Sequence, residues 1–240
     1  MTDLIISKGS INYKEIPYIF SENKPIIFWD TCSLLYFNSI VDRRAYREYE
    51  WDLKLLDLIK SGDVYSTTSY IVYYEYNKHH TNLKNIDEER ESDLKSIMQQ
   101  YGKILGGQDE ADLQKGIDTL HLSAHMESLV RLLWSNTYII DEDVSFLQKA
   151  HNRVLAGMAP SSEKQQYKDC YIWETFLTLC DCLTNKGIAY FMTENTVDYC
   201  GKKSKIPLTD IQKELADHKG NLEITKSKLW IDIAKILGII

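Results

Sequence analysis

The feature that most constrains the fold is a short apolar run that stops abruptly at an acidic residue. The segment Ile26–Trp29 is β-branched and aromatic, Pro25 precedes it, and Asp30 follows it. This composition predicts a buried strand of a parallel sheet. Asp30 then lies just past the carboxyl end of the strand, where open α/β sheets bind their ligands. An Asp at such a place is also common as a turn or cap residue, so its role depends on partners elsewhere.

Strand patterns alternate with helix patterns along much of the chain. Further strands are predicted at 63–67, 188–193 and 222–225, and amphipathic helices lie between them. Residues 81–160 show helix patterns only, so we interpret them as a helical insertion. Alternation of this kind favours an α/β class with a parallel sheet and helices on both faces. At 240 residues the chain is expected to form a single domain, 1–240, that carries this insertion at about 81–160.

Composition limits the function and the compartment. The net charge of −7 argues against a protein whose main task is to wrap nucleic acid, but it does not exclude a nuclease with acidic metal ligands. The five cysteines are odd in number and irregularly spaced, which favours reduced thiols. No signal-peptide pattern and no apolar run long enough to span a membrane occurs. We therefore expect a cytoplasmic protein without membrane contact.

Four acidic residues occupy comparable places in the predicted elements. Asp30 and Asp198 follow strands, Glu75 lies on the helix after the second strand, and Asp169 lies on the helix that leads into the late strand. A parallel sheet can bring such residues to one edge. Carboxylates without His or Cys suit hard cations such as Mg²⁺ and Mn²⁺. Phosphodiester hydrolysis is a reaction that uses such ions, because they activate water and stabilise the leaving oxygen.

The segments around these acids resemble the motifs of PIN domains and occur in the same order. The four segments are Phe28–Leu35, Val72–Glu75, Tyr167–Glu174 and Phe191–Tyr199. The resemblance covers roughly 25–80 and 163–226 and leaves the helical block outside. It implies a PIN-like three-layer α/β/α fold with a central parallel sheet.

The resemblance also implies a function, a metal-dependent endoribonuclease. Asp30, Glu75, Asp169 and Asp198 would be the catalytic residues and would hold Mg²⁺ or Mn²⁺. Asn195 stands where many family members carry a second Asp, so it can offer an oxygen or a hydrogen bond but no charge. Supporting roles are expected for Thr31, Glu174, Thr193 and Asn195.

Basic residues near these segments suggest where RNA would lie. Arg43 and Arg44 begin a helix, where positive charge is unfavourable to the helix dipole and therefore hints at another use. Lys202, Lys203 and Lys205 form a basic loop that could steer a phosphate backbone.

A second interpretation keeps the fold but not the activity. The chain would then be a catalytically weak or inactive interaction module, or a toxin-like subunit held by a partner protein. An inhibitory partner and a homo-oligomer both stay open at this point.

Overall fold

The computed structural model describes residues 6–37, 43–161, 166–183, 188–201 and 206–240, with side chains described outside 36–37, 43–48 and 108. Six strands form one sheet. The strands are β1 (Gly9–Ile11), β2 (Ile26–Trp29), β3 (Tyr65–Ser69), β4 (Thr137–Ile140), β5 (Ala189–Met192) and β6 (Gly220–Glu223).

The sheet is parallel throughout, in the order β1-β4-β3-β2-β5-β6. From β2 the chain continues to β3 and β4 on one side, whereas β5 and β6 lie on the other side. The gap between the ends of β2 and β5 is therefore the topological switch point, the usual place for a ligand. In the register of these two strands Trp29 lies opposite Met192, so Asp30 and Thr193 follow side by side.

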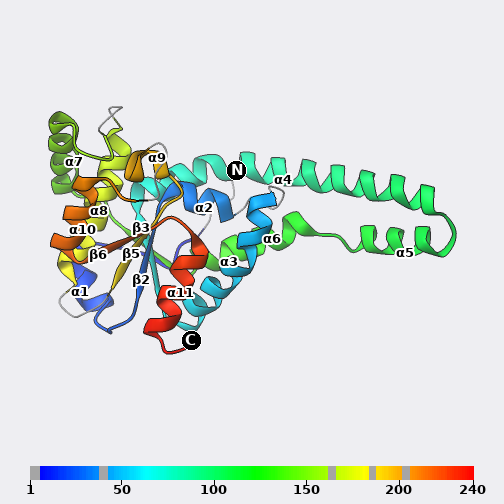
Figure 1. The fold of residues 1–240 in the computed structure, drawn as a ribbon, viewed down its shortest axis with the longest axis horizontal. Helices are drawn as coiled ribbons and strands as arrows, with labels where there is room; N and C mark the ends of the chain where they lie inside the picture. Colours follow the sequence, from blue (N-terminus) through cyan, green and yellow to red (C-terminus); the bar gives the residue numbers. More distant parts are fainter. Residues whose placement is uncertain (1–5, 38–42, 162–165, 184–187, 202–205) are drawn as a thin grey trace.

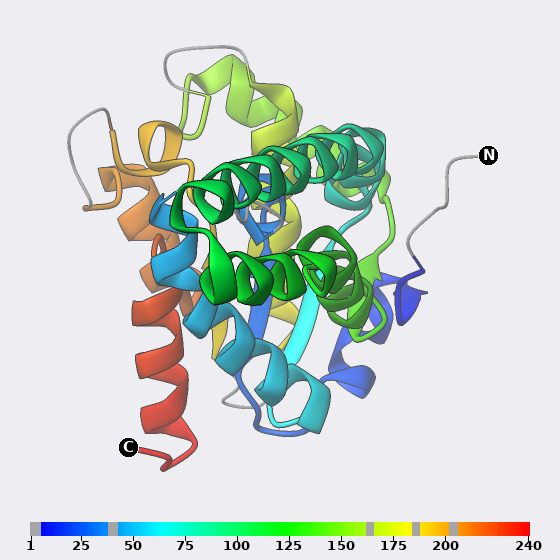
Figure 2. The same cartoon turned by 90° about the vertical axis from the view of Figure 1, so that its right-hand side faces the viewer.

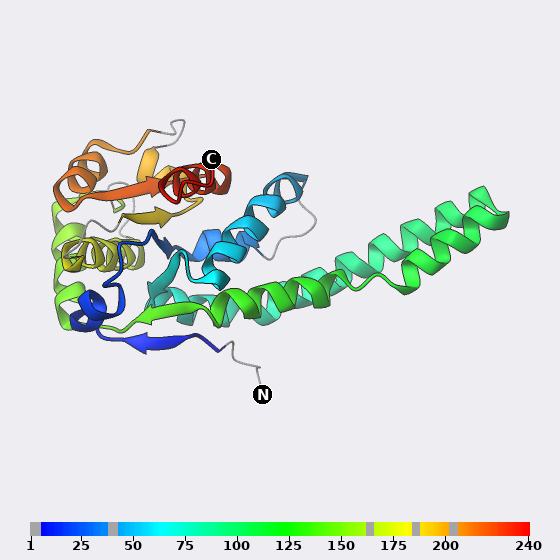
Figure 3. The ribbon, with the colours of Figure 1, turned by 90° about the horizontal axis from the view of Figure 1, so that it is seen from below.

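Helices cover both faces of the sheet. Their bounds are η1 (Tyr13–Glu15), α1 (Ile16–Ile19), α2 (Thr31–Phe37), α3 (Arg43–Ser61), α4 (Tyr70–Leu105), α5 (Gly107–Asp118), α6 (Leu122–Trp134), α7 (Val144–Ala156), α8 (Tyr167–Cys182), α9 (Thr196–Cys200), α10 (Thr209–His218) and α11 (Lys226–Ile236). One layer holds α8 with α7 and α10 beside it, and the opposite layer holds α3, α6 and α11 (Figures 1 and 3). The predicted three-layer α/β/α class is confirmed.

The central strands show why the apolar runs of the sequence become strands. All four residues of β2 and all four of β5 are buried, as expected for parallel strands covered on both faces. In strand β3 the four residues after the half-buried Tyr65 are buried too, although they are Ser-Thr-Thr-Ser. Its hydroxyls find partners inside the sheet: Ser66 accepts from Trp29 Nε1 at 2.8 Å, and Thr68 donates to the Trp29 carbonyl at 2.7 Å. Buried hydroxyls satisfied in this way do not oppose strand formation.

The interpretation of 81–160 as entirely helical is wrong at one place. Residues 137–140 form β4, which lies inside the sheet between β1 and β3. The run Thr-Tyr-Ile-Ile is short and follows α6 closely, and periodicity alone cannot distinguish four apolar residues at a helix end from a strand. Residues 9–11, where no strand was predicted, form the edge strand β1 beside β4.

The helices of this region also differ from the prediction. Helix α4 continues from Tyr70 to Leu105 without a break, so it crosses the boundary at about 81 where the insertion was predicted to begin. Helices α5 and α6 follow it within the insertion. The outer half of α4 and α5 form a hairpin that projects from the body (Figure 1). Among the described helices, none has both the length and the apolar character required to cross a bilayer.

Candidate active site

Asp30 is held at the carboxyl end of β2 by a set of hydrogen bonds. Its backbone N–H donates to Met192 on β5 at 3.0 Å, which ties the two central strands together. The carboxylate accepts from the Thr31 N–H at 2.7 Å, from the Thr193 hydroxyl at 2.6 Å and from the Cys32 thiol at 3.1 Å. Burial raises the pKa of Asp30 above its ordinary value, while these three donors act in the opposite direction.

Glu75 reaches the same place from the second turn of α4. One carboxylate oxygen accepts a hydrogen bond from the Thr31 hydroxyl at 2.9 Å, and the other forms an ion pair with Lys168 on α8. Burial raises the pKa of Glu75, but the bonds from Lys168 and Thr31 outweigh it and leave the pKa below its ordinary value. Thr31 therefore links the two acids, since its N–H contacts Asp30 and its hydroxyl contacts Glu75.

Asp169 lies in the first turn of α8, beside Lys168. Burial raises its pKa from 3.8 to about 7, and the negative charges of Asp30, Asp198 and Glu75 add to the shift. Only part of this is offset by the neighbouring ammonium of Lys168. The charges of the other three acids therefore all act on Asp169.

Asp198 and Asn195 form a pair on α9. The Asn195 amide donates to the Asp198 carboxylate at 2.7 Å, and its carbonyl oxygen caps the helix at the Asp198 N–H. The Asn195 N–H donates to the Thr193 hydroxyl at 3.0 Å, and that hydroxyl in turn donates to Asp30. Asn195 thus holds Asp198 in place, in addition to facing the cavity described next.

One cavity of about 620 Å³ brings most of these residues together. Its walls include Asp30, Glu75, Asp169 and Asn195, and Thr31 also contributes. Asp198 is not a lining residue; it acts from behind Asn195 through its charge on Asp169. Three of the four predicted acids and two of the predicted supporting residues therefore face the same space, and Thr193 lies below it.

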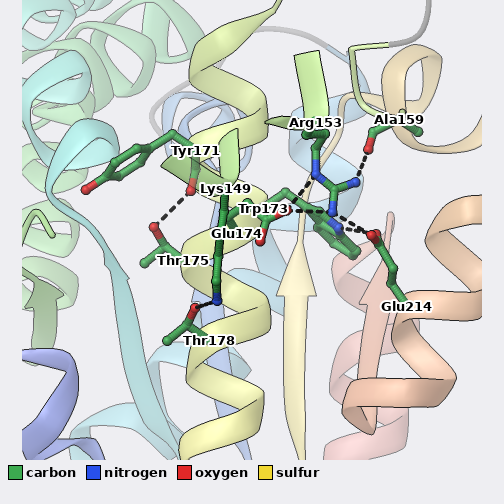
Figure 4. A network of polar contacts seen from close by, with 9 residues as sticks. All are labelled: Lys149, Arg153, Ala159, Tyr171, Trp173, Glu174, Thr175, Thr178 and Glu214. Atoms are coloured by element: carbon green, nitrogen blue, oxygen red, sulfur yellow. Dashed lines mark hydrogen bonds and ion pairs between the residues drawn. The ribbon is translucent and has the colours of Figure 1, made fainter. Parts of the chain in front are cut away.

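Glu174 does not belong to this cavity. It is buried on α8, accepts a hydrogen bond from Arg153 Nε at 2.8 Å and forms an ion pair with Arg153 Nη2 at 2.7 Å (Figure 4). Arg153 also binds Glu214 at 2.5 Å and the Ala159 carbonyl, and Trp173 Nε1 donates to Glu214 at 2.8 Å. The supporting role predicted for Glu174 is therefore not what the structure shows. Five residues after Asp169, its side chain lies well round the helix, among α7 and α10.

The residues predicted to contact RNA are not placed in detail. Arg43 and Arg44 open α3, but their side chains fall outside the described part of the structure. Lys202, Lys203 and Lys205 fall outside the described residues altogether.

Two of the lining residues that were not predicted from the sequence, Cys32 and Lys168, contact the acids directly. Cys32 lies 3.1 Å from Asp30, and burial raises the pKa of its thiol far above the ordinary value, so it stays protonated. Lys168 lines the cavity beside Glu75 and Asp169. A signal for Lys168 was present, because it lies in the first turn of a helix, where the dipole disfavours a cation.

Comparison with known proteins agrees with this geometry. A family model described as the PIN domain matches residues 27–199, which is more than half of the chain. This chain belongs to the PIN-domain family. PIN domains are generally nucleases and typically use divalent metals. A search of curated proteins gave no match. Solved structures gave none either.

The oxygen atoms that line the cavity are of the kind that binds a hard divalent cation, but they are not grouped around a common point. The cavity offers carboxylate and amide oxygens, and the raised pKa of Asp169 marks negative charge that a cation would neutralise. The buried Tyr199 hydroxyl, whose pKa is raised by burial and by Asp30 and Asp169, makes no hydrogen bond within the described residues. Among the residues that the structure describes, no group of three or more His, Cys, Asp or Glu side chains is arranged so that it could hold a metal ion. The carboxylates are instead engaged with Thr31, Thr193 and Lys168.

Proposed function

We propose that this PIN domain is a metal-dependent endoribonuclease that hydrolyses phosphodiester bonds of RNA. The observation that carries the proposal is the approach of Asp30, Glu75 and Asp169 to one cavity at the switch point of the sheet. Carboxylates repel one another, and burial makes the repulsion stronger. A site that keeps them together without a function would lose stability for no gain.

The acidic residues would hold Mg²⁺ or Mn²⁺. Asp30, Glu75 and Asp169 face the cavity and are the ligands we expect, with Asp198 contributing charge from behind Asn195. When bound, the ion would supply an activated water and would stabilise the charge that develops on the phosphate. Asn195 carries no charge where many family members have an Asp, which favours fewer ions rather than more.

The other residues of the site would hold and orient the acids. Thr31 and Thr193 fix the two oxygens of Asp30, and Thr31 also fixes Glu75. Lys168 would leave Glu75 and turn to a phosphate oxygen when RNA enters, since both are anionic partners for an ammonium group. Further from the cavity, the RNA backbone would be contacted by basic residues, namely Arg43, Arg44, Lys202, Lys203 and Lys205. The protein would act in the cytoplasm.

A catalytically weak interaction module is the second candidate, and one observation favours it. Glu75 is already neutralised by Lys168, and Asp30 already accepts three hydrogen bonds. These contacts satisfy two of the acids without a metal. In that case the chain would act through a partner protein rather than on RNA.

One experiment separates the two candidates. Purified protein is incubated with fluorescently labelled single-stranded RNA and Mn²⁺, with and without a chelator. We expect cleavage that the chelator abolishes and that the double variant Asp30→Asn with Asp169→Asn lacks. Cleavage that survives in the double variant would refute the assignment of the site. No cleavage together with no Mn²⁺ binding in a titration would favour the interaction module.

A further inference from the structure

The helical hairpin carries a row of apolar side chains that the fold does not cover. Helix α4 runs from the cavity, where it holds Glu75, to the tip of the hairpin, where Gly106 begins the turn into α5. The two helices lie side by side as they leave the body (Figures 2 and 3). Gly102 lies at the contact between them, where a Cβ would make ordinary van der Waals contacts with Glu110 at 3.6 Å and with Leu113 of α5 at 3.8 Å.

The apolar side chains follow a heptad spacing. They are Leu94, Ile97, Tyr101, Ile104 and Leu105, and we call them the arm stripe. Leu94 and Tyr101 are seven residues apart, as are Ile97 and Ile104, which is the spacing of a coiled-coil seam. Tyr101 is 62% exposed and Ile104 is 78% exposed.

The arm stripe is separate from the contact between α4 and α5. The small cavity between the two helices is lined by Met98 and Gly102 of α4 and by Leu113 of α5. On a helix Met98 lies about 70° and Gly102 about 110° from the centre of the stripe, and Leu105, seven residues after Met98, is the stripe member nearest to this contact. The hairpin therefore holds itself together with one face and presents another apolar face to solvent. An exposed row of this kind marks a surface that binds a partner.

The charges of the hairpin indicate which partner fits. Its outer part, from Lys95 to Lys115, carries three basic and three acidic residues and therefore no net charge. The inner part of α4, from Lys84 to Asp93, carries five acidic and two basic residues. Neither part would attract the phosphates of RNA or of anionic lipids. Two neutral outer parts, by contrast, can meet without repulsion.

We propose that the arm stripe pairs with the arm stripe of a second copy of this chain, in antiparallel orientation. In the register that buries the row, Leu94 packs against Ile104 of the second copy and Ile97 against Tyr101 of the second copy. This orientation keeps the two acidic inner parts at opposite ends, whereas parallel pairing would place them against each other. Because α4 is continuous, Glu75 lies about 44 Å along the helix from Ile104. The two cavities are therefore held far apart in the dimer, and the proposal does not depend on nuclease activity.

Analytical ultracentrifugation of the full chain tests the pairing. The wild type is expected to dimerise with a dissociation constant on the order of 10 µM, since the row is short. Ile97→Glu with Ile104→Glu should weaken the dimer by about 100-fold or more, because both copies lose apolar contacts and gain buried charges. Leu155→Glu is the matched control, as Leu155 is 72% exposed on α7. A wild type that stays monomeric up to about 200 µM, or a stripe variant that dimerises as well as the control, would overturn the proposal.

Disulfide cross-linking tests the orientation. A chain with Ile97→Cys mixed with a chain with Tyr101→Cys should form cross-linked dimers under mild oxidation. Each variant alone should form no more than the wild type, which serves as the background for the native cysteines. If Ile97→Cys alone cross-links efficiently, the helices pair in parallel and the proposed register is wrong.

Discussion

Asp169 and Glu174, two of the acidic side chains of helix α8, lie in opposite surroundings. Asp169, in the first turn of α8, faces a cavity that it shares with Asp30 and Glu75, and burial together with the charges of the surrounding acids raises its pKa to about 7. Glu174 is more deeply buried, yet it is bound by both the Nε and Nη2 of Arg153 (Figure 4). The same helix thus carries one carboxylate that lies among other acids and one carboxylate that is paired with a guanidinium group.

The difference separates a site that needs a ligand from one that does not. A buried ion pair is complete within the fold, and breaking it leaves a charge without a partner. The negative charge of carboxylates that repel one another is not compensated by the fold, and a bound cation would compensate it. We therefore expect substitutions at the first place to change function and substitutions at the second to change stability.

The largest effect is expected on activity. Asp169→Asn should lower the rate of RNA cleavage by about 100- to 1000-fold, because it removes a charge that acts on the transition state. Glu174→Gln should change the rate by less than about threefold once folding is verified by circular dichroism. The measurement is single-turnover cleavage of labelled RNA in Mn²⁺. If the two variants lose cleavage rate to the same extent, the proposed functional difference between Asp169 and Glu174 is wrong.

The next effect is on stability and concerns Arg153. Arg153→Met should lower the free energy of unfolding by about 3 to 5 kcal/mol, because Glu174 and Glu214 then stay buried without their cation. Lys149→Met, one turn earlier on α7, is the control; Lys149 is exposed and only reaches the Thr178 hydroxyl at 3.2 Å. Urea denaturation gives both values. A cost below about 1 kcal/mol for Arg153→Met would mean that the network is not what stabilises this part of the fold.

A smaller effect of opposite sign is expected for Asp169 in the absence of metal. Its raised pKa means that the folded state favours the protonated form, so the charged form costs stability above the unfolded pKa. Asp169→Asn should therefore raise the free energy of unfolding at pH 8 by about 2 kcal/mol, less than the full shift implies because water reaches the cavity. The gain should shrink as the pH falls below about 7 and disappear near pH 4. Unfolding in a chelator at several pH values checks this, and a gain that grows toward low pH would contradict it.

The smallest effect on stability is expected for Lys168. Its side chain is 61% exposed, so Lys168→Met should cost less than about 1 kcal/mol. The same change frees Glu75 from its ion pair and should tighten Mn²⁺ binding by about threefold. Isothermal titration gives the Mn²⁺ affinity without any RNA. Weaker Mn²⁺ binding in this variant would show that Lys168 supports the ion rather than competing with it.

The central part of the fold could be predicted because its signals are local. Ile26–Trp29 and 188–193 are continuous apolar runs, and the structure has β2 and β5 there, all of whose residues are buried. Strand β4 was not predicted because a run of four residues between two helices is too short to show the periodicity of a strand. The length of α4 was not predicted either. The insertion was expected to begin at about residue 81, but α4 continues through that point.

The sequence by itself determined which residue types stand at the strand ends. Asp30 and Thr193 follow the apolar runs directly, Asn195 comes two residues after Thr193, and Glu75 and Asp169 lie on the adjoining helices. Only the tertiary structure decided which of them share a space. It brought Asp30, Glu75 and Asp169 to one cavity and placed Asp198 behind Asn195. It also placed Glu174 in an ion pair with Arg153. The physical reason is that these partners lie far apart in the chain, so no local pattern can state which charge will meet which.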